Sequence, residues 1–294
     1  MLTCHSLVLL CNLVNHELNS SVLDCCFSAD GSIVFSGGTD KKVRMWRGGA
    51  PPNGLAEKIG SHDAPVKSVR FLPRANLVAS GGWDRKLKFW DIRSPSNPVR
   101  VVDLPERVYA MDVCEDLLVV ATANRHILAY NMTGGMLREQ YRKESSLKYQ
   151  TRCITAFPDR KGFAVGAIDG RVGIDYFTEV PGRASFDFRC HRQGVNAYAV
   201  NGICFHKLGT FATYGSDGAV KFWDKDKKDR LKVFPTIGRP ISCASFNANG
   251  SLFAYASSYD WSKGSTHHTP QTPDEIYIHY VLEDEIKPKT EKRF

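Results

Sequence analysis

Four residues have side chains and spacing that suit a hydrogen-bonded array: His62, Ser80, Asp84 and Trp90. In a hydrolase, an aspartate orients a histidine, and the histidine activates a serine nucleophile. The same residues also suit a structural array, in which Asp84 in a tight turn accepts a hydrogen bond from His62. Ser80 would then link His62 to the indole N–H of Trp90, because a buried charge is tolerated when it is hydrogen-bonded.

Repetition along the chain favours the structural array. Three segments align with one another: SGGTDKKVRMW (36–46), SGGWDRKLKFW (80–90) and YGSDGAVKFW (214–223). In each segment an aspartate stands six residues before a tryptophan. A catalytic triad would not recur in this way, so we interpret the array as a structural tetrad.

Degenerate copies of the repeat fill the gaps between these segments. The turn positions recur every 40 to 48 residues, at Asp40, Asp84, Asn124, Asp169, Asp217 and Asp260. That period is typical of the four-stranded blades of a propeller. Short β-branched and aromatic runs alternate with Gly, Asn and Asp turns, and no long segment has a helical pattern. The sequence predicts an all-β WD-repeat propeller with six visible repeats, over residues 20–286.

The composition indicates a globular protein and excludes several functional classes. Of 294 residues, 43% are hydrophobic and 24% charged, and no apolar run reaches the roughly 18 residues of a membrane helix. Nine cysteines without a C-x-x-C pair favour free thiols, with no metal site and no cofactor. No nucleotide-binding or hydrolase motif is present, so we predict no enzymatic activity. The net charge of +8 permits nucleic acid or an acidic partner.

Several segments are more specific than a generic repeat: GGWDRKLKFWDIRS, LPERVYAMDV and FAYASSYDWSKG. With them the chain resembles the mRNA-export WD-repeat family of the nuclear pore, the Rae or Gle family, from about Val22 to about Lys289. The related mitotic-checkpoint propellers of the Bub type are similar in CHR (190–192) and GRV (170–172). The segment SYDWSKG favours the export branch.

The resemblance implies a seven-bladed scaffold without catalytic activity. Its partner would be the acidic helical hairpin, or GLEBS motif, of a nucleoporin, in a hetero-complex with this chain as a monomeric subunit. The family also implies RNA contact through phosphates, no membrane insertion, and a location in the nucleus, the nuclear envelope and pore, and the cytoplasm. The alternative is a mitotic-checkpoint or spindle scaffold that binds a GLEBS-like motif of a kinase or kinetochore protein.

The chain departs from the family at its N-terminus. Six repeats are visible rather than seven, and the first repeat of the family has no counterpart. Residues 1–19 form an atypical segment in which LVLLCNLV (7–14) could supply an outer strand that pairs with the last blade. Without such a strand two blade edges would be open, which favours aggregation. Residues 287–294 are predicted to be a basic, solvated tail.

Two groups of residues are candidates for partner binding. The first is Arg171 with His191 and Arg192. The resemblance implies that the two arginines match family positions that pair with glutamates of the GLEBS motif. An arginine offers a planar fork that holds a carboxylate with two hydrogen bonds. Arg171 could instead be a solvated turn residue.

The second group consists of Phe205, Trp223, Asp224 and Lys225, in the segments VNGICF and KFWDK. An aromatic spot beside several cations suits a peptide anchor or a stacked base near a phosphate, and the resemblance places a ligand site here. The alternative is a core tryptophan followed by a charged hairpin turn. For Trp223 both are predicted: a structural ring with one exposed edge.

Overall fold

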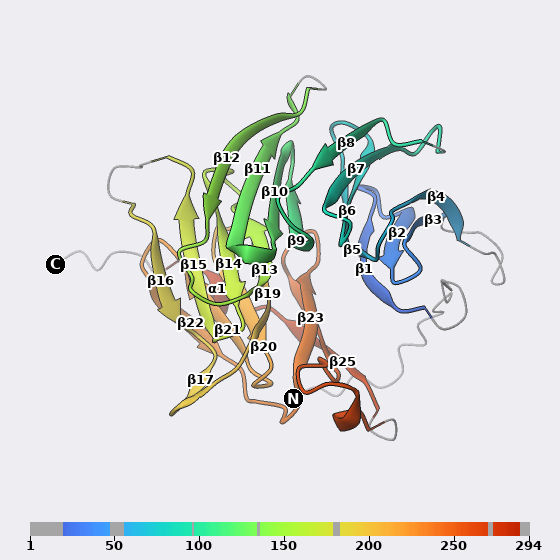
Figure 1. The fold of residues 1–294 in the computed structure, drawn as a ribbon. Coiled ribbons are helices and arrows are strands. Elements are labelled where there is room, and N and C mark those ends of the chain that lie inside the picture. Colours follow the sequence, from blue (N-terminus) through green and yellow to red (C-terminus); the bar gives the residue numbers. More distant parts are fainter. Residues whose placement is uncertain are drawn as a thin grey trace. The chain divides into compact units, whose positions relative to one another are not determined.

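The computed structural model describes residues 20–47, 56–95, 97–133, 136–178, 183–269 and 273–288, and nearly all of its regular structure is antiparallel β-sheet (Figure 1). The chain divides into two compact units, Met1–Val102 and Asp103–Phe294.

The first unit contains two four-stranded meanders. One sheet consists of β1 (Val22–Phe27), β2 (Ile33–Gly38), β3 (Lys42–Arg47) and β4 (Glu57–Ser61). The other consists of β5 (Val66–Leu72), β6 (Leu77–Gly82), β7 (Lys86–Asp91) and β8 (Arg100–Asp103). In both sheets the second strand is largely buried, as the apolar runs IVFSGG and LVASGG require.

The second unit contains four more sheets with the same meander order. The third sheet consists of β9 (Val108–Cys114), β10 (Leu117–Thr122), β11 (His126–Asn131) and β12 (Arg138–Glu144). The fourth consists of β13 (Thr151–Ala156), β14 (Gly162–Ala167), β15 (Arg171–Tyr176) and β16 (Phe186–Arg189). The fifth consists of β19 (Val200–Phe205), β20 (Phe211–Gly215), β21 (Val220–Asp224) and β22 (Asp229–Val233). The sixth consists of β23 (Ile241–Phe246), β24 (Leu252–Ser257) and β25 (Glu275–Tyr280).

These six sheets are the blades of a β-propeller, and the predicted all-β fold with six repeats is confirmed. Burial follows strand position within a blade. All six residues of β10 are buried, whereas the outermost strand β12, REQYRKE, is exposed except at one half-buried position. Apolar side chains from neighbouring blades of the second unit pack between the sheets, as Phe222 of the fifth blade does against Phe246 and Phe253 of the sixth.

The sixth blade has three strands within the described residues. Its edge strand, β25, exposes Ile276, Ile278 and Tyr280 on one face. The segment predicted to supply an outer strand, residues 7–14, lies outside the described residues, as do all of 1–19 and most of the predicted basic tail.

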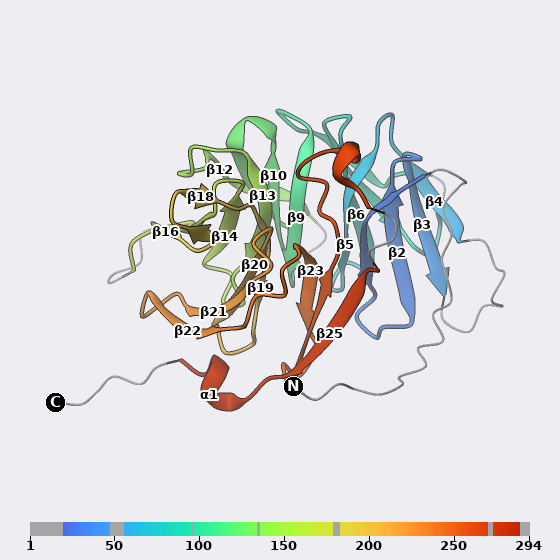
Figure 2. The ribbon, with the colours of Figure 1, turned by 90° about the horizontal axis from the view of Figure 1, so that it is seen from below.

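Short elements connect and brace the strands of the second unit. A small hairpin, β17 (Arg192–Gln193) with β18 (Asn196–Ala197), precedes β19, and single 3-10 turns occur at η1 (Ala123–Arg125) and η3 (Ser265–His267). The helix α1 (Glu283–Ile286) lies beside β21 and β22 (Figure 2). Its Glu285 carboxylate binds His279 at 2.7 Å and Lys232 at 3.1 Å, so it ties the last blade to the fifth.

The described part of the chain contains seven cysteines, and all seven are free thiols. Cys153 and Cys190 are buried, whereas Cys25 and Cys243 are exposed. Among the described residues, no His, Cys, Asp or Glu group has the arrangement of a metal site, and no helix is long and apolar enough to span a bilayer.

The meander gives blades four and five two distinct ends. The turn between β14 and β15, the loop before β19 and the turn between β20 and β21 lie at one end, here called the Arg192 end. The turns between β19 and β20 and between β21 and β22 lie at the other, the Lys225 end. The two predicted groups of binding residues therefore occupy opposite ends of the same blades.

Candidate binding site

The second blade contains the predicted array of four side chains. His62 Nδ1 lies 2.9 Å from Asp84 Oδ2, and His62 Nε2 lies 2.8 Å from Ser80 Oγ. The indole N–H of Trp90 donates to Ser80 Oγ at 2.7 Å. Burial raises the pKa of Asp84, but hydrogen bonds from His62 and the backbone N–H groups of Asp63 and Lys86 outweigh it and lower that pKa.

This geometry suits a structural role and does not suit nucleophilic catalysis. Ser80 has no exposed surface, and its hydroxyl is held between His62 and the Trp90 indole. A substrate carbonyl has no route to that oxygen. The array instead fixes the tight turn at Asp84 against the loop that carries His62.

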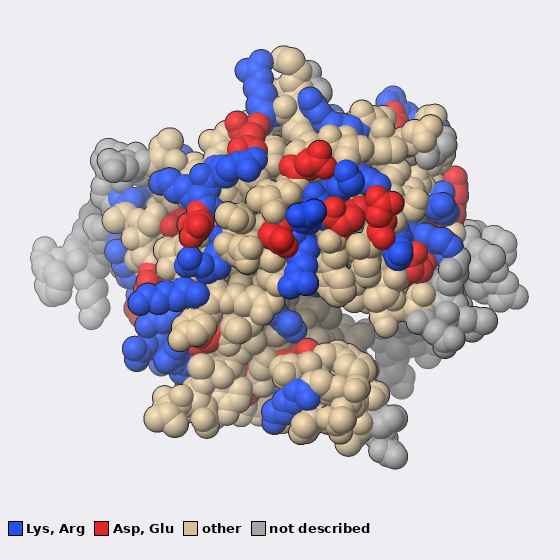
Figure 3. Space-filling model, viewed as in Figure 1, with Lys and Arg blue, Asp and Glu red and all other residues tan. Residues whose placement is uncertain are grey.

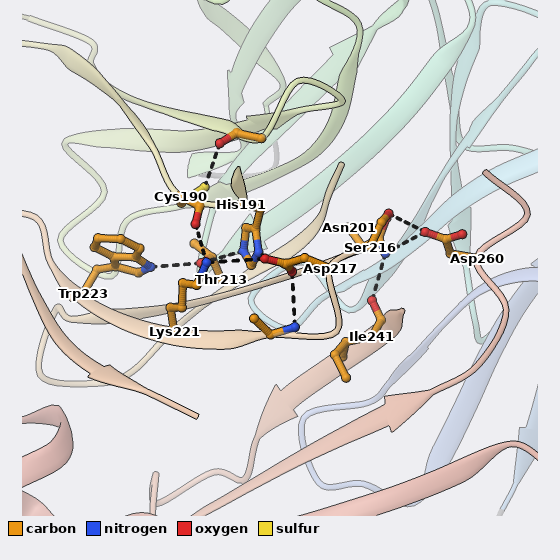
Figure 4. Close-up of polar contacts among 12 residues, drawn as sticks. Cys190, His191, Asn201, Thr213, Ser216, Asp217, Lys221, Trp223, Ile241 and Asp260 are labelled. Atoms are coloured by element: carbon orange, nitrogen blue, oxygen red, sulfur yellow. Dashed lines mark hydrogen bonds and ion pairs between the residues drawn. The ribbon is translucent and has the colours of Figure 1, made fainter. Parts of the chain in front are cut away.

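The fifth blade contains a second array with threonine in place of serine (Figure 4). His191 Nδ1 lies 2.7 Å from Asp217 Oδ1, and His191 Nε2 lies 3.0 Å from Thr213 Oγ1. The indole N–H of Trp223 donates to Thr213 Oγ1 at 2.9 Å. Lys221 Nζ lies 3.4 Å from Asp217 Oδ2 and also donates to the Cys190 carbonyl.

The second array changes the roles of two predicted binding residues. His191 has no exposed surface, so it does not offer the partner contact predicted for it and instead stabilises the fifth blade within the array. Trp223 is partly exposed and belongs to the array, as expected for a structural ring with one open edge.

Sequence reasoning did not recognise this second array, although the spacing carries a signal for it. Thr213 precedes Trp223 by ten residues, and Ser80 precedes Trp90 by the same number. The histidine precedes the aspartate by 26 residues here and by 22 in the second blade, since the hairpin β17–β18 is inserted between them. Because the interval between histidine and aspartate differs, the similarity of the two arrays is not evident from the sequence.

The buried histidine predicts a pH-dependent stability. Burial lowers the pKa of His191 below its usual value, against the opposing effect of Asp217. In the unfolded chain His191 takes up a proton below about pH 6.5, while the folded form stays neutral until a lower pH. Protonation therefore favours the unfolded chain, and we expect the free energy of unfolding to fall as the pH drops from about 7 to about 5.5.

Urea unfolding at the two pH values measures this dependence. A His191→Asn variant should show a shallower pH dependence than the parent, whereas His267→Ala, at an exposed position, should keep the parental slope. If the free energy of unfolding depended equally on pH in the parent and in His191→Asn, His191 would not be the group responsible.

The arginine group at the Arg192 end is assembled around one carboxylate. Arg171 Nε and Arg192 Nη2 each lie 3.5 Å from Asp169 Oδ2. Arg192 Nε also donates to the Asp169 carbonyl at 3.1 Å, and Arg171 forms an ion pair with Asp187. The arginine side chains are 30% and 29% exposed, while that of Asp169 is 10% exposed. The shared carboxylate is thus nearly buried, while both arginine side chains remain partly exposed.

An exposed cation and two exposed apolar residues lie near this arginine pair in the chain or in the strand register. Arg189 is exposed and lies directly opposite Arg171 in the register of β15 and β16. Ile168, just before Asp169, is 41% exposed, and Val195, at the tip of the hairpin that starts with Arg192, is 97% exposed. Cations beside apolar groups form a surface that fits an amphipathic acidic segment.

At the Lys225 end, burial separates structural from accessible residues. Lys225 is 4% exposed; its Nζ lies 2.9 Å from Asp226 Oδ1 and 5.2 Å from the centroid of the Phe157 ring. Asp224 is also buried, and its Oδ1 accepts the N–H groups of Asp226 and Lys227 in the turn. Neither side chain offers the surface that the predicted partner contact needs.

Phe205 is half-buried at this end. Its ring contacts Phe157 and Phe211, with centroid distances of 5.4 and 5.2 Å. The exposed cations among the described residues of the two turns here are Lys207, Lys227 and Lys228, with Arg230 at the start of β22; Lys228 lies over the Phe186 ring at 4.7 Å. Figure 3 shows Lys and Arg side chains gathered over the part of the surface where β16 and β22 lie. The exposed cations at this end therefore lie in the turn after β19, in the turn before β22 and on β22 itself.

Comparison with known proteins agrees with the repeat architecture. The family described as "WD domain, G-beta repeat" matches residues 7–47, 55–91 and 183–224. The chain is 45% identical to Protein RAE1 of Arabidopsis thaliana, over 94% of this chain and 78% of that protein. It is 46% identical to the mRNA export factor of Bos taurus, over 92% of this chain and 76% of that protein. It is 43% identical to the WD40 repeat protein poxJ of Penicillium oxalicum, over 91% and 80%.

Proposed function

Because the chain belongs to the WD-repeat mRNA export factor family, we propose that it is a non-enzymatic adaptor whose arginine pair binds an acidic helical hairpin of a nucleoporin, the GLEBS motif. Membership indicates a role in mRNA export between nucleus and cytoplasm. Docking on the nucleoporin would bring the protein to the nuclear envelope and the pore, as one subunit of a hetero-complex.

One observation carries the proposal: Arg171 and Arg192 share the Asp169 carboxylate, and their side chains remain 30% and 29% exposed. Each guanidinium has five N–H donors, and their bonds to Asp169 and Asp187 leave some of them available. A glutamate of the partner can therefore bind with two hydrogen bonds while Asp169 holds both arginines in place. Because the side chains of both arginines are already ordered in the free protein, binding costs less conformational entropy, which favours tight binding.

The exposed apolar residues supply the second half of the interface. Ile168 and Val195 flank the arginine pair along the chain and can cover the apolar side of a helical hairpin. Affinity in such interfaces comes mainly from a few buried anchors, with charged groups setting orientation and association rate. The same surface would serve a GLEBS-like motif of a checkpoint protein, so cell-cycle-dependent localisation, and not peptide binding, separates that alternative function from export.

Calorimetric titration of a GLEBS-type hairpin peptide into the purified protein tests the proposal. We expect one peptide bound per chain, and much weaker binding of a matched peptide whose glutamates are replaced by glutamine. Equal binding of both peptides, or no binding by a protein with cooperative thermal unfolding, would rule out recognition by the arginine pair.

A further inference from the structure

The loop between β24 and β25 carries a cluster of three aromatic rings: Tyr259, Trp261 and His268. The rings of Trp261 and His268 are stacked, with centroids 5.0 Å apart and planes 15° apart. Trp261 is nevertheless 59% exposed. A stack of two rings that leaves most of an indole exposed is a candidate interaction site, because tryptophan is enriched where proteins bind other molecules.

The open part of this cluster is the face of the indole opposite His268. The Tyr259 ring lies 5.5 Å from Trp261 and 6.0 Å from His268. If Tyr259 covered the opposite face of the indole, the indole would lie between Tyr259 and His268, and their centroids would be much farther apart than 6.0 Å. Tyr259 therefore lies beside the stack, and the second indole face is accessible for another flat ring.

Asp260, next to Trp261, anchors the loop to the fifth blade (Figure 4). Its buried carboxylate accepts hydrogen bonds from the Ser216 hydroxyl and, at 3.3 Å, from Asn201 Nδ2. Arg152 Nη2 donates to the Asp260 carbonyl at 3.3 Å. Since Ser216 lies in the turn between β20 and β21, the loop is held at the Arg192 end of the second unit.

Trp261 itself is held in a strained backbone conformation. Its φ is +59°, and it is the only aromatic residue with positive φ in the described part of the chain. Bulky residues rarely adopt this region, and the strain persists only where the surroundings enforce it. Here the Tyr259 hydroxyl accepts the N–H of Lys263 at 3.2 Å and donates to the Gly264 carbonyl at 2.8 Å. The loop thus presents the indole outwards in a fixed position.

The charged side chains of residues 261–269, the part of the loop that carries the stack, have one sign. Asp274, at the other end of the loop, is exposed and lies 3.6 Å from Arg239. Residues 261–269 are all exposed; they include Lys263, His267 and His268 and contain no aspartate or glutamate. The acidic residue beside them, Asp260, is buried and hydrogen-bonded. An open aromatic face beside a cation combines the two features that single-stranded nucleic acid requires, a stacking surface for a base and a cation for its phosphate.

We propose that the Trp261–His268 stack is a binding site for one base of single-stranded RNA, with Lys263 close to the neighbouring phosphate. The choice of RNA rests on the proposed function in mRNA export; the place of the site rests on the loop alone. Stacking explains why the free face is flat and exposed, because every base has a π face and sequence-specific hydrogen bonds are not needed.

Fluorescence anisotropy with two labelled oligonucleotides tests the site: oligo(A), and an abasic chain of equal length that keeps the phosphates. The parent should bind oligo(A) more tightly than the abasic chain. Trp261→Ala should weaken oligo(A) binding about tenfold and leave abasic binding unchanged. Trp261→Phe, which keeps a flat ring on the same backbone, should retain most of the preference for bases. Trp83→Ala removes another exposed indole, which lies in the second blade. This control should leave the preference for oligo(A) over the abasic chain intact.

Three results would overturn the proposal: no preference of the parent for oligo(A) over the abasic chain, a preference that survives Trp261→Ala, or an equal loss in Trp83→Ala. The hairpin peptide titration separates this failure from failure of the adaptor function. If Trp261→Ala weakens peptide binding and leaves RNA binding unchanged, the loop is a protein contact and not an RNA site. If the parent binds the peptide and no RNA, the adaptor proposal stands and the RNA site is wrong.

Discussion

Replacement of Asp217 by alanine is expected to lower the free energy of unfolding by about 3 kcal/mol. The side chain is 1% exposed and accepts hydrogen bonds from His191 at 2.7 Å and from the Ala219 N–H at 3.2 Å. Its removal leaves both donors buried without an acceptor. Lys221, whose side chain is 12% exposed, also loses its counter-charge.

Urea unfolding followed by circular dichroism measures this loss. The matched control is Asp274→Ala, because the Asp274 side chain is 76% exposed and its nearest pairing atom, on Arg239, is 3.6 Å away. We expect the control to change stability by less than about 0.5 kcal/mol, as for other exposed ion pairs. A loss of similar size in both variants, or none in Asp217→Ala, would mean that the second array does not stabilise the fifth blade.

Replacement of Arg192 by glutamate is expected to weaken binding of the acidic hairpin about a hundredfold, or about 3 kcal/mol. The variant removes a bidentate donor and places a negative charge next to Asp169, so it both deletes an attraction and adds a repulsion. Arg192→Lys should lose less, about tenfold, because lysine keeps the charge and loses the planar fork. Arg171→Glu should resemble Arg192→Glu, since both arginines share one carboxylate.

The control for this prediction is Arg230→Glu. It makes the same change in net charge on an exposed residue at the opposite end of the fifth blade. A thermal melt of each variant excludes unfolding as the cause of weak binding. If Arg230→Glu weakens the peptide as much as Arg192→Glu does, long-range attraction to a basic protein explains binding and the arginine pair does not.

The period of the repeats was sufficient to predict the fold. The Asp–Trp spacing and the 40–48-residue period report local hairpin geometry, which short-range sequence determines. The array of the second blade could be assigned in advance for the same reason. The array of the fifth blade could not, because threonine replaces serine and an inserted hairpin lengthens the interval before Asp217.

The roles of single residues at the candidate site depended on contacts between blades, which local patterns do not reveal. Lys225 follows a strand and appears in sequence as one of several exposed cations. It is buried because its ammonium group packs on Phe157 of the preceding blade. Trp261 shows the opposite case: its aromatic character suggests a core residue, and the anchoring of Asp260 to Ser216 turns its side chain outwards.

If the arginine pair recognises carboxylates of the partner directly, an exchange of charges between the two molecules should restore binding. The measurement is the affinity of Arg192→Glu for a GLEBS-type peptide in which one glutamate at a time is replaced by arginine. We expect one exchanged peptide to recover most of the lost affinity with this variant and to bind the parent poorly. If no exchanged peptide recovers binding to a folded Arg192→Glu protein, direct pairing at this position is contradicted.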